Sequence, residues 1–156
     1  MPDRILLVED DPDWQEIIVE DLTGRGYDVT TVVSLRGALT MLEANPPYEV
    51  VITDIALSSS TANRDGVELL EIVHRRWPMT TAIAVSGRAS KGNVERFKER
   101  YHALDYLDRS VLVHEPDNFL ALVDRAAGLS RRAGTRGGGV SDESASVGGG
   151  GPQGVA

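Results

Sequence analysis

Acidic, hydroxyl and basic side chains stand close after short apolar runs in four separate stretches of this sequence. Glu9 and Asp10 follow the first run, Asp54 the third, Ser86 the fourth and Arg109 the fifth. If those runs are neighbouring parallel strands, their carboxyl ends lie at one edge of a sheet, where open α/β folds bind ligands. We therefore expect three carboxylates, a hydroxyl and a cation to meet there.

Such a group has a definite chemistry. Close carboxylates repel one another unless a cation neutralises them, and oxygen ligands without histidine or cysteine suit a hard ion such as Mg²⁺. A carboxylate beside that ion can attack phosphorus and form an aspartyl phosphate, while the metal and a basic side chain stabilise the charged oxygens. Taken singly, the acids also fit a plainer interpretation, in which Asp10 and Asp11 cap a helix and Asp54 begins a turn.

The elements that must position these groups alternate along the chain. Apolar runs typical of buried parallel strands are followed by residues at helical spacing. Asp11 supplies a cap for the first helix and Ser34 can cap the second. Five such units predict an α/β fold, a doubly wound five-stranded parallel sheet with helices on both faces. The predicted strands cover 4–8, 27–33, 50–53, 82–85 and 103–107, and the predicted helices cover 12–24, 35–44, 67–77, 92–100 and 119–126.

Composition and charge narrow the possible functions. At 156 residues the chain is one domain's worth of protein, and its lack of cysteine excludes disulfides, thiolate metal sites and cysteine nucleophiles. A net charge of −8 argues against non-specific nucleic-acid binding. No apolar run approaches the roughly 18 residues of a membrane span, and the first run is too short for a secretory signal. We expect a cytoplasmic protein without a membrane partner.

The composition changes at residue 128. The last 29 residues hold ten glycines and no aromatic residue. Such a segment buries too little apolar surface to offset the entropy of ordering. We expect residues 1–127 to form the folded domain and residues 128–156 a disordered tail containing glycine, serine and arginine. Arg131, Arg132 and Arg136 in that tail either contact an acidic partner or remain solvated.

Five segments, in this order and at this spacing, resemble the response-regulator receiver domain of two-component signalling. The resemblance covers about residues 3–127. It implies a flavodoxin-like fold with strand order 2-1-3-4-5, a phosphoprotein in a phosphorelay, and Mg²⁺ as the cofactor. The segments are ILLVEDD at 5–11, VVITD at 50–54, DGVELL at 65–70, VSG at 85–87 and ALDYL at 103–107.

Matched by position, the resemblance implies roles for the acidic residues. Asp54 matches the phosphoacceptor. Asp10 matches the acid that binds Mg²⁺ directly, and Glu9 the neighbouring acid that usually acts through water. Ala56, two residues after the phosphoacceptor, would offer its backbone carbonyl to the ion.

The resemblance also implies a switch, and it includes departures from the family pattern. Ser86 matches the hydroxyl that engages the phosphoryl group, and Tyr106 matches the aromatic residue that then packs inward, although Tyr106 also fits ordinary strand packing. Arg109 stands where the family has a catalytic lysine, and Ser110 where it has proline. An arginine fork is not interchangeable with a compact ammonium at a tight site, and Asp108 could divert Arg109 by pairing with it.

Two connecting segments are longer than in the family pattern. The step from Asp54 to Gly66 is about four residues longer, a length that a surface loop tolerates. Residues 58–61 either lean over the phosphorylation site or form a tolerated surface insertion. Residues 110–116 are also extended, so we expect a reshaped surface after the fifth strand.

Three functions remain open from the sequence. The first is a stand-alone receiver that accepts a phosphoryl group on Asp54 from a histidine kinase or histidine phosphotransfer protein, and signals to a protein effector without binding nucleic acid directly. Its only chemistry would be its own phosphorylation and dephosphorylation, so we do not expect an enzyme. The alternative is a degenerate receiver, a protein-interaction module that works without phosphorylation. The third, a Mg²⁺-dependent phosphohydrolase, usually needs a second acid where this chain has Ala56.

Overall fold

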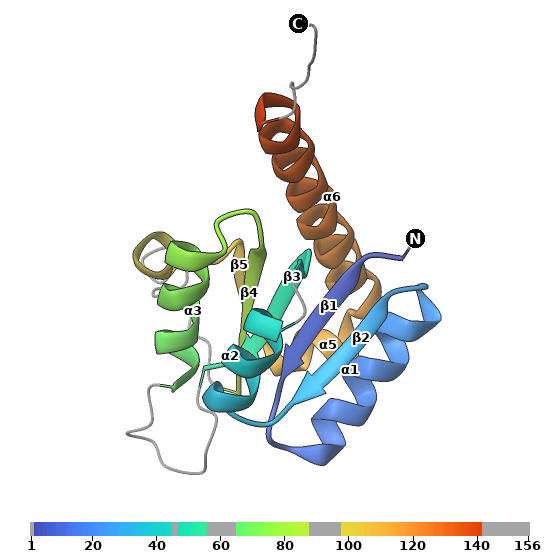
Figure 1. Cartoon of the computed structure of the whole chain (residues 1–156). Helices are drawn as coiled ribbons and strands as arrows, with labels where there is room; N and C mark the ends of the chain where they lie inside the picture. The colour runs from blue at the N-terminus through green and yellow to red at the C-terminus, as the bar shows by residue number, and fades with distance from the viewer. Residues whose placement is uncertain (1, 45–46, 56–64, 88–97, 142–156) are drawn as a thin grey trace, which may run out of the picture.

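Five parallel strands form a single sheet in the order β2-β1-β3-β4-β5. The computed structural model describes residues 2–44, 47–55, 65–87 and 98–141 of the chain. The sheet confirms both the predicted α/β class and the strand order that the family resemblance implied. The strands are β1 (Arg4–Val8), β2 (Asp28–Val32), β3 (Val50–Asp54), β4 (Thr81–Ser86) and β5 (Asp105–Asp108) (Figure 1).

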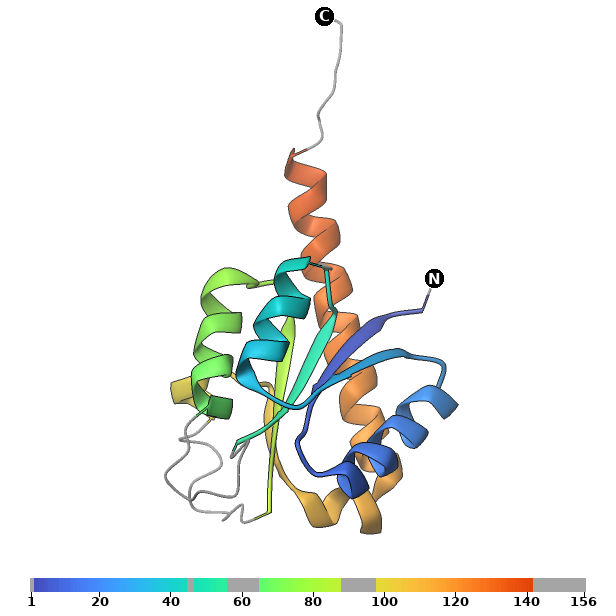
Figure 2. The same ribbon diagram turned by 60° about the horizontal axis from the view of Figure 1, so that its bottom comes forward.

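Helices cover both faces of this sheet. Figure 2 shows α2 and α3 on one face and α1 and α6 on the other. Most of the helix predicted around 92–100 lies outside the described residues, although residues 98–100 are helical. The labelled helices are α1 (Pro12–Gly24), α2 (Leu35–Ala44), α3 (Asp65–Arg76), α5 (Arg109–His114) and α6 (Pro116–Ser141).

The first two helices begin at the caps that the sequence predicts. The Asp11 carboxylate accepts a hydrogen bond of 2.9 Å from the backbone N–H of Asp13. The Ser34 hydroxyl accepts one of 3.0 Å from the backbone N–H of Gly37. Each cap satisfies a donor that the first turn of a helix leaves without a partner, and so fixes where the chain leaves the strand before it.

The core lies on both sides of the central strands. Every residue of β3 is buried. Val50 and Ile52 face the cluster formed with α1, α5 and α6, whereas Val51 faces the cluster formed with α2 and α3. Burial on both faces explains why the residues from Val50 to Ile52 are all apolar and do not alternate with polar residues.

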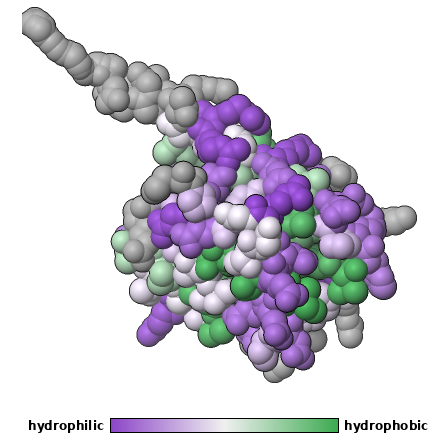
Figure 3. Space-filling view, turned by 90° about the vertical axis from the view of Figure 1, so that its right-hand side faces the viewer, coloured by the Kyte–Doolittle hydropathy of each residue, from purple (hydrophilic) through white to green (hydrophobic). Residues whose placement is uncertain are grey.

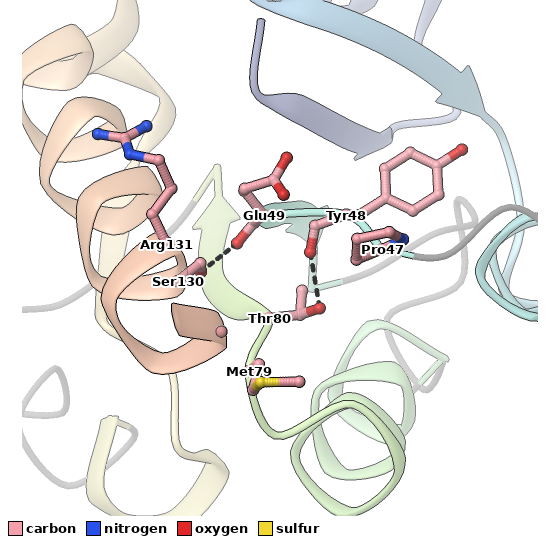
Figure 4. A pocket seen from close by; sticks show the side chains of 8 residues that line it. Pro47, Tyr48, Glu49, Met79, Thr80, Ser130 and Arg131 are labelled. Atoms are coloured by element: carbon pink, nitrogen blue, oxygen red, sulfur yellow. Dashed lines mark hydrogen bonds between the residues drawn. The ribbon is translucent and has the colours of Figure 1, made fainter. Parts of the chain in front are cut away.

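Helix α6 corrects the predicted start of the tail, because it continues from Pro116 to Ser141 with no break at residue 128. Ala127 is fully buried and Ser130 is 6% exposed. The Ser130 hydroxyl donates to the Glu49 carbonyl over 2.5 Å (Figure 4) and accepts from the Thr81 N–H over 3.1 Å. These contacts hold the helix just after Gly128, a position where glycine costs about 1 kcal/mol relative to alanine. Residues 142–156, the rest of the predicted tail, lie outside the described part of the chain.

The anchor of α6 lies at the amino-terminal edge of the sheet. A surface pocket of about 410 Å³ beside it is lined by Tyr48, Met79 and Arg131 among others (Figure 4). Tyr48 comes shortly before β3 and Met79 shortly before β4, so this pocket is at the opposite edge from the acidic residues that end the strands.

On the face seen in Figure 3, hydrophobic side chains lie in several small groups between hydrophilic ones. Among the described residues, no helix combines the length and the apolar character needed to cross a bilayer.

Candidate functional site

The carboxylates of Glu9, Asp10 and Asp54 come together at the carboxyl edge of the sheet. One carboxylate oxygen from each residue lies within 4.8 Å of the other two. The register explains this, because β1 and β3 are paired with Val8 opposite Thr53, and the acids are the next residues on each strand. Glu9 is 1% exposed and Asp54 7% exposed, whereas Asp10 faces solvent. The predicted convergence of the three acids is confirmed.

This donor set fits a hard divalent ion. It consists only of carboxylate oxygens, and these are the ligands that Mg²⁺ prefers in proteins. Two of the acids are buried and one is open to water, so an ion held here would keep contact with solvent, as Mg²⁺ usually does. Ala56, whose carbonyl was the fourth predicted ligand, lies outside the described residues.

Glu9 is held in place by its own neighbours in the chain. The backbone N–H of Asp11 donates to the Glu9 carboxylate over 3.1 Å, and the Gln15 amide donates to the Glu9 carbonyl over 3.0 Å. Burial raises the pKa of Glu9 to about 7, and the negative charge of Asp54 acts in the same direction. The Asp11 N–H and Arg109 act against this rise in pKa. A cation in the group favours the charged form of Glu9.

Arg109, which directly follows the outermost strand β5, supplies such a cation. Its Nη2 donates to both carboxylate oxygens of Glu9 over 2.9 Å, and also to Oδ2 of Asp54. The Arg109 side chain is 19% exposed. Its guanidinium carbon lies 5.2 Å from the centre of the Trp14 ring, within the range of a cation–π contact. The arginine that replaces the family's lysine therefore still brings its positive charge to the acids.

A short helix that the sequence did not predict positions Arg109. Arg109 is the first residue of α5, and Asp108 caps this helix by accepting a 2.9 Å hydrogen bond from the Ser110 N–H. Leu112, one turn further on, is buried in the core. The prediction that Asp108 could divert Arg109 from the site is wrong, because the arginine reaches Glu9 and Asp54.

The two predicted switch residues lie on neighbouring strands. Ser86 is the last residue of β4, one position beyond Val85, which pairs with Asp54. Ser86 is therefore at the same edge of the sheet as the acids. Tyr106 is half-buried and packs against the cluster that contains Ala84 and Ala103. Its place agrees with ordinary strand packing, and its role as a switch stays a prediction.

Sequence reasoning missed the part that Gly66 plays at this site. A Cβ atom at Gly66 would lie 2.1 Å from the carbonyl oxygen of Asp54 and 2.5 Å from that of Ile55. The first turn of α3 therefore rests directly on the backbone that carries Asp54. The available signal was a glycine at the second position of a helix, where glycine otherwise only weakens the helix.

Comparison with known families agrees with this geometry. A sequence model described as "Response regulator receiver domain" matches residues 5–117. The nitrogen assimilation regulatory protein NtrX of Azorhizobium caulinodans is 35% identical over 95 residues, which are 61% of this chain and 20% of that protein. A putative NtrX-like response regulator of Rickettsia bellii is 29% identical over 129 residues, 81% of this chain and 25% of that protein. This chain thus spans a quarter or less of these curated relatives.

Solved structures show the same arrangement of strands and helices. A CheY-like receiver domain protein from Methanospirillum hungatei superposes with a TM-score of 0.71 and 26% identity, covering 85% of this chain and 99% of that one. The receiver domain of NtrX from Brucella abortus superposes with a TM-score of 0.65 and 23% identity, covering 80% of this chain and 98% of that one.

Proposed function

Because the chain belongs to the response regulator receiver domain family, we propose that Asp54 accepts a phosphoryl group from a histidine kinase or a histidine phosphotransfer protein. In this step the phosphorus–nitrogen bond of a phosphohistidine breaks and a bond forms between phosphorus and an Asp54 carboxylate oxygen. The released imidazole nitrogen takes up a proton. The observation that carries the proposal is the meeting of Glu9, Asp10 and Asp54, with Arg109 beside them.

Each neighbouring residue has a task in this proposal. Glu9 and Asp10 hold the divalent ion together with Asp54. When bound, Mg²⁺ supplies positive charge that offsets the charge on the phosphoryl oxygens. Arg109 is near enough to Asp54 to donate hydrogen bonds to the phosphoryl oxygens, and the Ser86 hydroxyl can donate another from the end of β4. Gly66 fixes the backbone from which the Asp54 side chain projects.

The signal leaves the site through protein contacts. We propose that the aspartyl phosphate draws on Ser86, that Tyr106 follows, and that a protein effector recognises the altered surface around β5. The relay would work in the cytoplasm and would need no nucleic acid at the receiver itself. Since the curated relatives are much longer than this chain, whether the receiver works alone stays a prediction.

Intact-mass measurement tests the phosphorylation. The full chain is incubated with Mg²⁺ and acetyl phosphate, and we expect one phosphoryl group on the unaltered protein and none on Asp54→Asn. Asp28→Asn is the matched control, because Asp28 is an exposed aspartate at the start of β2. A phosphoryl group that persists in Asp54→Asn, or that is lost in Asp28→Asn, contradicts the assignment.

One observation favours a second candidate function. The Arg109 guanidinium already forms ion pairs with both buried acids, as it would in a degenerate receiver that binds its partners without phosphorylation. If this candidate holds, the unaltered chain takes up no phosphoryl group from acetyl phosphate or from a phosphorylated histidine kinase. Uptake from either donor excludes it.

A further inference from the structure

The Arg109 guanidinium contacts two of the three acids that would hold a divalent ion. A single nitrogen, Nη2, contacts both carboxylate oxygens of Glu9 over 2.9 Å and also Oδ2 of Asp54. The carboxylates of these two residues belong to the group of three whose oxygens lie within 4.8 Å of one another. The positive charge therefore lies on two of the three carboxylates that are the candidate metal ligands.

A metal and this nitrogen compete for the same two carboxylates. A divalent ion would bind carboxylate oxygens at roughly 2.1 Å, closer than the 2.9 Å that separates Nη2 from the Glu9 oxygens. The two cations would also repel each other, because Glu9 and Asp54 are buried and water screens charges beside them less than it does at the surface. Each cation therefore weakens the binding of the other.

We propose that Arg109 is the resident cation of this acidic group, and that a divalent metal binds only when the Arg109 side chain leaves Glu9 and Asp54. The inference deepens the proposed function and rests on it, since it concerns the same metal site. The receiver would then keep its two buried acids paired with Arg109 at low metal concentration, and metal binding would free the guanidinium to contact a phosphoryl group.

The environment of Arg109 allows this departure. Its Nε is buried and has no hydrogen-bond partner among the described residues, so the side chain is not locked at that atom. The guanidinium lies over Trp14, which is also partly exposed. Movement of Arg109 would change the surroundings of the Trp14 ring. The fluorescence of Trp14 should therefore report whether Arg109 leaves the acids.

The chain offers a closely matched control at the opposite edge of the sheet. Arg76, the last residue of α3, pairs with Glu43 over 2.8 Å and lies 4.6 Å from the centre of the Trp77 ring. It therefore has the same charge, an acidic partner and a tryptophan neighbour, but no contact with the three acids. Arg76→Gln changes the net charge as Arg109→Gln does.

Calorimetric titration with Mg²⁺ tests the competition directly. We expect Arg109→Gln to bind Mg²⁺ at least tenfold more tightly than the unaltered chain, and Arg76→Gln to stay within twofold of it. Equal or weaker binding by Arg109→Gln overturns the proposal. An equal gain in Arg76→Gln also overturns it, because the effect would then come from net charge alone.

Tryptophan emission tests the displacement without relying on the folding of an Arg109 variant. Trp77→Phe leaves Trp14 as the sole tryptophan, since the chain contains two. We expect Mg²⁺ to change the Trp14 emission with the midpoint found by calorimetry. Unchanged emission at saturating Mg²⁺ overturns the proposal, and so does an absence of Mg²⁺ binding.

The two proposals fail separately. If Arg109→Gln gains no affinity while Asp54 still takes up a phosphoryl group, the competition is wrong and the proposed function stands. If Arg109→Gln binds Mg²⁺ tightly but Asp54 is never phosphorylated, the competition stands and the proposed function is wrong.

Discussion

Replacement of Gly66 by alanine should damage the site without touching any of its charged side chains. The new Cβ would meet three backbone atoms, the nearest being the Asp54 carbonyl oxygen at 2.1 Å and the Ile55 carbonyl oxygen at 2.5 Å. Ordinary contact begins at about 3.4 Å, so the start of α3 and the end of β3 must separate by more than 1 Å. Backbone atoms cannot turn aside as a flexible side chain does.

The expected loss follows from the cost of overpacking. Inserting a methyl group into a well-packed site costs roughly 1–3 kcal/mol and sometimes more. Alanine regains about 0.5–1 kcal/mol relative to glycine in a helix, but here the contacts are with backbone and lie at the severe end of the range. We expect Gly66→Ala to lower the free energy of unfolding by about 2 kcal/mol, which lowers the Tm by roughly 6–10 °C for a domain of this size.

Urea denaturation of the two glycine variants checks this reasoning. Gly24→Ala is the matched control, because a Cβ at Gly24, the last residue of α1, has no atom within 4 Å. Its free energy of unfolding should be unchanged or up to about 1 kcal/mol higher. The reasoning is refuted if Gly66→Ala is as stable as the unaltered chain, or if both variants lose the same amount.

Two further substitutions test contacts that hold α6. Burial tends to raise the pKa of Asp124, but hydrogen bonds from Arg25 and Tyr27 outweigh it, so the pKa of Asp124 is lowered. The contribution of Asp124 to stability is therefore present above about pH 4 and is lost as the pH falls through the lowered pKa. In urea denaturation, Asp124→Asn should lower the free energy of unfolding by about 1 kcal/mol at pH 7 and by less at pH 3. An equal loss at both pH values would contradict this. Ser130→Ala removes the buried hydroxyl that contacts Thr81 and should cost about 1–2 kcal/mol in the same assay, whereas a cost below about 0.5 kcal/mol would show that this contact does not anchor the helix.

The convergence of the acids was predictable from the sequence because it depends only on topology. Glu9 and Asp54 each follow an apolar run, and parallel strands bring their carboxyl ends to one edge. The caps at Asp11 and Ser34 were predictable for a similar reason, since each is a local signal that tertiary packing did not overrule.

The contacts that the sequence did not predict are those between distant parts of the chain. The glycine-rich composition after residue 127 predicted disorder, but α6 continues past it, with Ala127 buried and Ser130 bonded to Glu49, just before β3, and to Thr81 in β4. Helix α5 is six residues long, too short for a periodic pattern to be recognised. That Arg109 reaches Glu9, one hundred residues earlier, depends on this helix.

Locating the phosphoryl group within the chain tests the central claim most directly. The protein is phosphorylated by acetyl phosphate with Mg²⁺, the acyl phosphate is trapped by borohydride reduction, and the modified residue is identified by peptide sequencing in a mass spectrometer. The account predicts modification at Asp54 alone. Modification at Asp10 or at any other residue, with Asp54 intact, would contradict it.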